Sequence, residues 1–180
     1  MNTNTYLDFL TNQIHTVIMA TTDNLQNPST CAIDIMDFDE QGLYFLTAKG
    51  KSFYERLKQH DTISLTGLQG NTTLSSQSVT IHGKVKEIGS FRLSALFQKN
   101  PYMYDIYPTK ESRMALTVFQ IYQGNGEFFD LSVQPIFRER FSFGSCESKG
   151  AGLFYINDDC INCKKCISVC PQKCIVYKNN

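Results

Sequence analysis

Tyr44-Phe45-Leu46-Thr47-Ala48-Lys49-Gly50-Lys51-Ser52 is the stretch of sequence that most constrains the fold. It begins with the aromatic and apolar character of a strand, and residues 52–59 then repeat apolar side chains at helical spacing. The turn brings Thr47, Lys51, Ser52 and backbone N–H groups to a helix N-terminus, which suits a phosphate group. Taken alone, the segment also fits a capped helix with solvated lysines.

Short runs of alternating apolar and polar residues flank this stretch on both sides. We expect strands at 17–21, 30–36, 43–47, 62–68, 78–88, 115–122 and 127–131, and helices at 5–13, 52–59 and 90–98. Gly124-Asn125-Gly126 is a strong hairpin signal between the last two strands. The pattern predicts a mainly β fold with helices (α+β), built as an antiparallel barrel.

Composition excludes several classes of protein. The 180 residues suffice for one well-cored domain and a small appendage, and the formal net charge of zero argues against a nucleic-acid binder. No Lys or Arg precedes Lys49, so we expect no secretory signal. No apolar run approaches the roughly 20 residues that cross a bilayer. We therefore expect a cytoplasmic protein with no membrane partner.

The cysteines point to a metal centre near the C-terminus. Of seven, five fall between Cys160 and Cys174, and four have the spacing Cys160-x2-Cys163-x2-Cys166-x3-Cys170-Pro171. Thiolates at this spacing are typical ligands of a 4Fe–4S cluster, and the run resembles bacterial-type ferredoxins. Zinc sites usually carry two Cys pairs about 12–20 residues apart, which fits this run poorly.

The fourth ligand of this cluster is open, because the chain has one such motif and not two. In two-cluster ferredoxins the Cys before Pro ligates the other cluster. Cys170 could complete the cluster of its own chain or that of a partner chain. Cys174, Cys146 or Cys31 could also serve, although Cys31 lies in an expected strand where a core role is the simpler interpretation.

We expect three segments along the chain: a barrel domain at 1–140, a linker at 141–152 rich in Gly and Ser, and a cluster module at 153–180. Residues 153–156 and 174–177 resemble short strands flanking the cluster loop.

Other chemistry-bearing residues give weaker signals. The histidines, His15, His60 and His82, are scattered and fit structural or surface roles. The loop with Tyr102, Tyr104 and Tyr107 could cover a ligand or pack against the barrel or a dimer partner. The sequence identifies no general acid or base, so the catalytic residues are unknown.

The order of these elements resembles the pyridoxamine 5′-phosphate oxidase-like family of FMN-binding split barrels, including its nitroimidazole-reductase-like branch. The resemblance covers about residues 3–132. It rests on the N-terminal helix, the Asn27-Pro28 turn, the turn at 45–52 and the strand at 78–85. Some members of that superfamily carry a C-terminal ferredoxin module, as here.

The resemblance implies a homodimer with FMN at its interface. It assigns the flavin phosphate to Thr47, Lys51 and Ser52, and the edge of the flavin ring to backbone groups of Thr30, Cys31, Ala32 and Ile33. Gln77 or Ser78 would reach the flavin or its phosphate. Where the oxidases carry a basic pair, this chain has Lys51-Ser52, with one charge fewer. Residues for the vitamin B6 substrate phosphate are not matched, so that reaction is not expected.

These features lead us to expect a reductase or electron-transfer protein that passes electrons between a 4Fe–4S cluster, FMN and a redox partner or small acceptor. The alternative is a redox or metal sensor whose barrel binds flavin without turnover. A haem or a deazaflavin in place of FMN is a further alternative.

Overall fold

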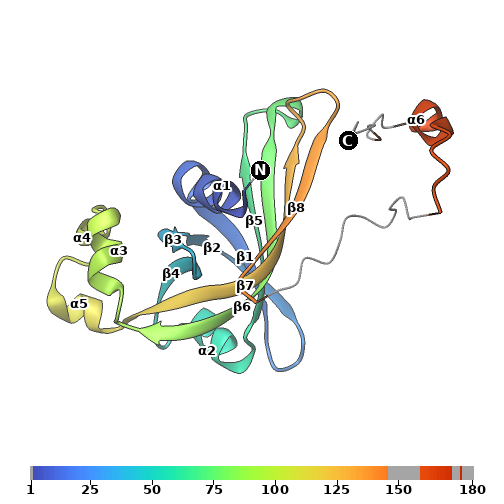
Figure 1. The fold of residues 1–180 in the computed structure, drawn as a ribbon. Coiled ribbons are helices and arrows are strands. Elements are labelled where there is room, and N and C mark those ends of the chain that lie inside the picture. The colour runs from blue at the N-terminus through green and yellow to red at the C-terminus, as the bar shows by residue number, and fades with distance from the viewer. Residues whose placement is uncertain (1, 146–158, 172–174, 176–180) are drawn as a thin grey trace.

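The computed structural model describes residues 2–145, 159–171 and 175, and shows a strongly curved sheet (Figure 1). The strands are β1 (Thr16–Thr22), β2 (Pro28–Asp34), β3 (Asp37–Asp39), β4 (Gly42–Ala48), β5 (Thr62–Gln69), β6 (Gln77–Gly89), β7 (Leu116–Asp130) and β8 (Phe137–Phe143). They lie in the order β2-β1-β5-β6-β7-β4-β3, and β8 pairs with β7. All these pairings are antiparallel, which confirms the predicted mainly β fold.

The helices occupy the ends and connections of this sheet. They are α1 (Thr3–Asp8), the π-helix η1 (Phe9–Ile14), α2 (Ser52–Gln59), the 3₁₀-helix η2 (Thr73–Ser75), α3 (Leu93–Lys99), α4 (Met103–Ile106), α5 (Lys110–Met114) and α6 (Lys165–Val169). Helices α3, α4 and α5 all lie in the connection from β6 to β7, at one end of the long strands (Figure 1). We call this connection, residues 90–115, the excursion.

The barrel interior is filled by alternating residues of the strands and by one face of α1 and η1. In β1, for example, Val17 and Met19 are buried while Ile18 between them is exposed. The ring of Tyr6 on α1 stacks between those of Phe128 and Phe141, with centroids 4.9 and 5.0 Å away. The N-terminal helix therefore closes the barrel by aromatic packing.

A second, smaller core lies on the outer face of β4 and of the first part of β7. Tyr44 and Val118 pack there against Leu96, Phe97 and Met103 of the excursion. The neighbouring residues on the same strands belong to the barrel interior, Phe45 on β4 among them. Strand β4 is thus covered on both faces, which explains why its sequence is apolar almost throughout.

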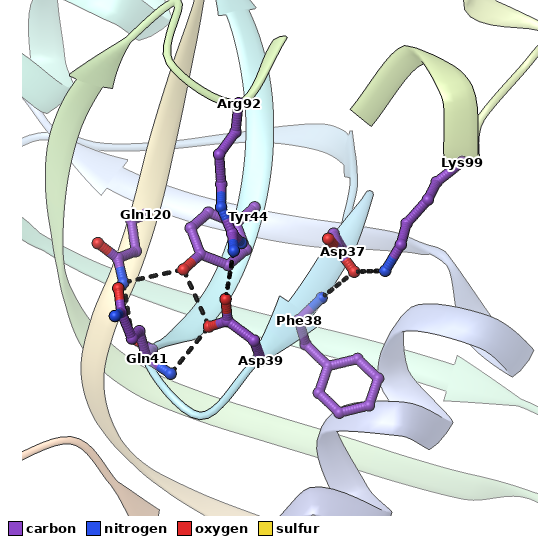
Figure 2. A network of polar contacts seen from close by, with 8 residues as sticks. All are labelled: Asp37, Phe38, Asp39, Gln41, Tyr44, Arg92, Lys99 and Gln120. Carbon is purple, nitrogen blue, oxygen red and sulfur yellow. Dashed lines mark hydrogen bonds and ion pairs between the residues drawn. The ribbon is translucent and has the colours of Figure 1, made fainter. Parts of the chain in front are cut away.

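Polar contacts fasten the excursion to β3 and β4 (Figure 2). The Asp39 carboxylate accepts hydrogen bonds from the Tyr44 hydroxyl, at 2.9 Å, and from Arg92 Nη2, at 2.5 Å. The Arg92 guanidinium also lies 4.0 Å from the centroid of the Tyr44 ring. Lys99 on α3 pairs with Asp37 on β3. Burial, followed by the contact with Asp39, raises the pKa of Tyr44 to about 12, so its hydroxyl remains a donor.

The predicted hairpin at 124–126 is wrong, because β7 runs unbroken through it. Gly124 pairs with Gly83 and Gly126 with Ile81 on β6. The glycines instead make room for aromatic rings of β8: a Cβ on Gly126 would lie 2.2 Å from Cζ of Phe141. These glycines contact rings of a neighbouring strand that lies far away in the sequence. Local turn chemistry therefore predicted a hairpin that is not there.

Other predicted elements shift by a few residues or extend further. Helix α2 has the predicted bounds, whereas the expected helix at 90–98 begins at Leu93. The predictions lacked β3 and β8, and residues 141–143, expected in the linker, belong to β8. The strand expected at 153–156, that expected at 174–177 apart from residue 175, and both Cys146 and Cys174 lie outside the described residues.

Replacing Asp39 by Asn should destabilise the fold, since Arg92 would lose its carboxylate partner. We expect a loss of roughly 1–2 kcal/mol in the free energy of unfolding, measured by urea denaturation. Glu40→Gln, at the exposed neighbouring position, is the matched control and should leave the urea midpoint unchanged. Equal midpoints for the two variants would show that the network in Figure 2 contributes nothing to stability.

Candidate functional site

A cavity of about 200 Å³ lies where the curved sheet remains open, between β2 and β4. It is lined by residues of β2, β4, α2, the excursion and the start of β7: Cys31, Ala32, Ile33, Leu46, Thr47, Ala48, Lys51, Phe53, Met103, Tyr107 and Leu116. Strand β2 is an edge strand that pairs only with β1. Alternate backbone N–H and C=O groups of an edge strand have no partner strand, so they are available to a ligand.

The cavity also has a positive end. Lys51 occupies the N-cap position of α2, where no side chain caps the helix, so the first backbone N–H groups of α2 are open to an anion. Burial raises the pKa of the Cys31 thiol, and the positive charges of Arg56 and Lys51 oppose that rise. Lys51 lines the cavity and Arg56 lies close enough to act on Cys31, so the local charge favours an anionic group.

Sequence reasoning overlooked Arg56. Its Nε donates a hydrogen bond of 2.8 Å to Oγ1 of Thr21 on β1, which holds the guanidinium against the barrel. Arg56 lies four residues after Ser52 on α2, hence on the same side of the helix. That spacing was the available signal. Arg56 thus adds a second positive charge to this side of α2, one turn after Ser52.

The predicted flavin residues divide into three groups. The cavity brings together Cys31, Ala32, Ile33, Thr47 and Lys51 from distant parts of the sequence. Thr30 and Ser52 adjoin lining residues without lining the cavity themselves. Gln77 lies elsewhere.

Gln77 belongs to a second cavity, of about 610 Å³, at the far end of the long strands. Its Nε2 donates to Oδ2 of Asp130 at 2.7 Å. Aromatic and amide side chains dominate the walls: Thr5, Tyr6, Asp8, Phe9, Gln13, Gln77, Phe128, Asp130, Val133, Gln134, Pro135 and Phe137. Leu116 at the first cavity and Asp130 at the second lie at opposite ends of β7. Gln77 lines the second cavity and is not among the residues that line the first.

The cysteine motif runs from an exposed turn through α6: Cys160 and Cys163 precede the helix, Cys166 lies in it, and Cys170 follows as its C-cap residue. Cys160, Cys163 and Cys166 are exposed, and Cys170 is half-buried. Asn162 and Lys164 have positive φ angles, which bend the chain sharply between the thiols. Within residues 2–145, 159–171 and 175, no three His, Cys, Asp or Glu side chains gather as a metal site. The thiol donor set nevertheless fits an iron–sulfur cluster, which requires soft sulfur ligands.

Family comparison assigns both parts of the chain. Residues 3–123 match the model of the pyridoxamine 5′-phosphate oxidase family, and the chain belongs to that family. Residues 153–176 match the model of the 4Fe–4S binding domain, which covers all four cysteines of the motif. No curated protein sequence matches the chain.

Solved structures share the fold at low sequence identity. A NimC/NimA family protein from Clostridium acetobutylicum aligns with a TM-score of 0.65 and 16% identity, over 78% of this chain and 91% of that one. A pyridoxamine 5′-phosphate oxidase-related, FMN-binding protein from Nostoc punctiforme aligns with a TM-score of 0.54 and 11% identity, over 77% and 92%. In the part of the chain that the structure describes, no helix has the length and apolar character needed to span a membrane.

Cys31 offers a test of the cavity through its raised pKa. Because the thiolate is the reactive form, iodoacetamide should modify Cys31 slowly near pH 7, and the rate should rise with pH. Added FMN should slow the reaction further, as measured by peptide mass spectrometry. The control is Cys160 in iron-free protein, which is exposed and should react readily. Equal rates at the two positions, unaffected by FMN, would contradict this assignment.

Proposed function

We propose that this protein is an FMN- and 4Fe–4S-dependent oxidoreductase that passes electrons to a small acceptor or a redox partner. The observation that carries the proposal is the first cavity. It combines an edge strand, an open helix N-terminus and the charges of Lys51 and Arg56. The same chain carries a sequence that matches a 4Fe–4S binding domain. Two redox cofactors on one chain favour electron transfer between them.

Each proposed role follows from the chemistry of the residues. Lys51, Arg56 and the first N–H groups of α2 hold the phosphate, and Thr47 adds a hydroxyl. The free edge of β2 at Cys31–Ile33 supplies backbone donors and acceptors to the flavin ring. Bound FMN exchanges electrons singly or in pairs, which lets a one-electron cluster serve a two-electron reaction. The protein contributes position and exclusion of water.

The proposed cluster is held by Cys160, Cys163 and Cys166, with Cys170 as the fourth ligand. Three exposed thiols on one sharply bent segment can reach one cluster with little rearrangement. The fourth position decides whether the centre is complete within one chain.

A homodimer would complete the flavin site. The first cavity, at about 200 Å³, is smaller than the ~300–1,000 Å³ typical of ligand pockets, so one chain encloses only part of FMN. The outer face beside it exposes an apolar side chain: Ile18, 53% exposed, pairs in register with Ala32 and Thr66. A second copy packed on this face would lie against Ala32, which also lines the cavity.

Absorption spectroscopy of the anaerobically purified full chain tests the proposal. We expect bands of oxidised flavin together with the broad absorption of an iron–sulfur cluster, and bleaching of both on reduction. A spectrum without flavin features that added FMN does not change would refute the flavin assignment. Protein that binds both cofactors but oxidises no hydride donor and reduces no acceptor would favour the redox sensor.

Lys51→Ala should weaken FMN binding roughly tenfold or more, because it removes a charge-assisted contact to the phosphate. Flavin fluorescence titration measures the dissociation constant. Lys49→Ala is the matched control, since Lys49 is exposed two residues earlier and does not line the cavity. If Lys49→Ala weakened binding as much as Lys51→Ala, general charge and not the cavity would explain the effect.

Cys170→Ser should lower the iron and sulfide content per chain, because the fourth thiolate is lost. Chemical analysis of anaerobically prepared protein measures both. Cys31→Ser serves as the control that keeps the motif intact, and its iron content should match that of the parent. A Cys170→Ser protein with a full cluster would exclude Cys170 and transfer the role to Cys174 or Cys146.

A further inference from the structure

Three titratable side chains from separate elements meet beside the first cavity. The Tyr102 hydroxyl donates to Oδ2 of Asp34 at 2.8 Å, and Nε2 of His15 lies 2.8 Å from the same hydroxyl oxygen. The imidazole and the Tyr102 ring meet edge to face, with centroids 5.8 Å apart. His15 Nε2 is 3.6 Å from the Asp34 carboxylate. The three groups form one contiguous network.

This network adjoins two walls of the cavity. Asp34 is the last residue of β2 and directly follows Ile33, which lines the cavity. Tyr102 directly precedes Met103, another lining residue, and Tyr107 completes that wall. The network therefore joins the strand proposed to hold the flavin ring to the excursion that covers it.

Helix α4 depends on few other contacts. Met103 is its one buried residue, while Tyr104 and Ile106 are exposed. Its backbone N–H groups bond within the excursion, for example from Met103 to the carbonyl of Asn100. Asn100 Nδ2 donates to the Met36 carbonyl at 2.9 Å, and Tyr102 adds the bonds to Asp34 and His15. The Tyr102 bonds lie next to Met103 and link this wall to β2, so the position of the wall is sensitive to them.

The His15 backbone adopts a strained conformation that aims its ring at Tyr102. Its φ of 65° and ψ of −64° correspond to a γ-turn that residues with a Cβ rarely adopt. Two bonds hold it there. The His15 N–H donates to the Leu10 carbonyl at 2.9 Å, and its carbonyl accepts from Ile35 N at 2.8 Å. Such strain persists where the surroundings fix it, and it is often found at functional positions.

The Tyr102 hydroxyl is a hydrogen-bond donor in this network. Burial and the Asp34 carboxylate raise the pKa of Tyr102, so this hydroxyl keeps its proton and donates it to Asp34. On the other side of the imidazole, Nδ1 of His15 lies 3.3 Å from the Thr11 carbonyl of η1. The network therefore spans η1, β2 and the excursion.

We propose that His15, Asp34 and Tyr102 are positioning residues that fix the Met103–Tyr107 wall and thereby strengthen the binding of FMN. This inference rests on the proposed flavin site. The described groups that face the imidazole are Asp34 from β2, Tyr102 from the excursion and the Thr11 carbonyl from η1. Thr16 on β1 donates to the other Asp34 oxygen, at 2.6 Å. Loss of the Tyr102 hydroxyl removes its bonds to Asp34 and His15 and loosens the wall.

The test compares Tyr102→Phe with Tyr104→Phe in the full chain. Tyr104 lies on the same helix and packs on Phe97 and Arg113 within the excursion, so it is the matched control. Tyr102→Phe should weaken FMN binding roughly three- to tenfold. Tyr104→Phe should bind FMN as tightly as the parent.

A Tyr102→Phe protein with the parent's affinity would overturn the coupling of the network to FMN. In His15→Asn the new residue tolerates positive φ better than most, so the turn should persist while Tyr102 loses its imidazole partner. This variant should also bind FMN more weakly than the parent. A His15→Asn protein with the parent's affinity would exclude His15 from the positioning network.

Amide hydrogen exchange without FMN separates this inference from the proposed function. The Tyr107 N–H donates to the Met103 carbonyl at 2.9 Å, and its exchange should accelerate in Tyr102→Phe but not in Tyr104→Phe. Unchanged exchange in both variants would overturn the positioning role whether or not flavin binds. Failure of the parent protein to bind FMN, with the exchange difference present, would instead refute the flavin site.

Discussion

The burial of β4 on both faces is the constraint on which the rest of the structure depends. Phe45 faces the barrel interior and Tyr44 the smaller core under the excursion, so the strand is held by two cores at once. Its end at Thr47 and Ala48, and the start of α2 that follows, are fixed in consequence. The charged end of the first cavity is built on this junction. A site that must hold a ring and a phosphate at fixed separation benefits from such a rigid base.

Much of this could be predicted from local sequence. Helix α2 has the bounds that its apolar spacing indicates, and the strand before it differs by one residue at each end. The resemblance of element order to a known family indicated which segments, 30–33 and 47–51, come together. The apolar spacing of one segment and the order of segments along the chain can both be read from the sequence. Neither requires knowledge of tertiary contacts.

The misses all involve contacts between residues far apart in the sequence. Gly124 and Gly126 have turn chemistry, yet rings from β8 decide their conformation. The position of the Arg56 guanidinium becomes clear only when the contact between α2 and Thr21 is known. Tyr102 meets His15 and Asp34 across more than 60 positions of sequence, which no spacing rule detects. Gln77 begins β6 and lines the second cavity instead of the first.

The excursion is structurally separate from the strands that form the barrel. It leaves the sheet after Gly89 and returns at Leu116. It contributes to the smaller core, and the ion pair between Lys99 and Asp37 attaches it to β3. Insertions, deletions or sequence drift between those two points would reshape the entrance to the cavity without shifting the register of any strand. Sequence changes in the excursion can thus alter which substrate enters the cavity while the strands that hold the cofactor stay the same. Such a separation lets one barrel serve many different reactions.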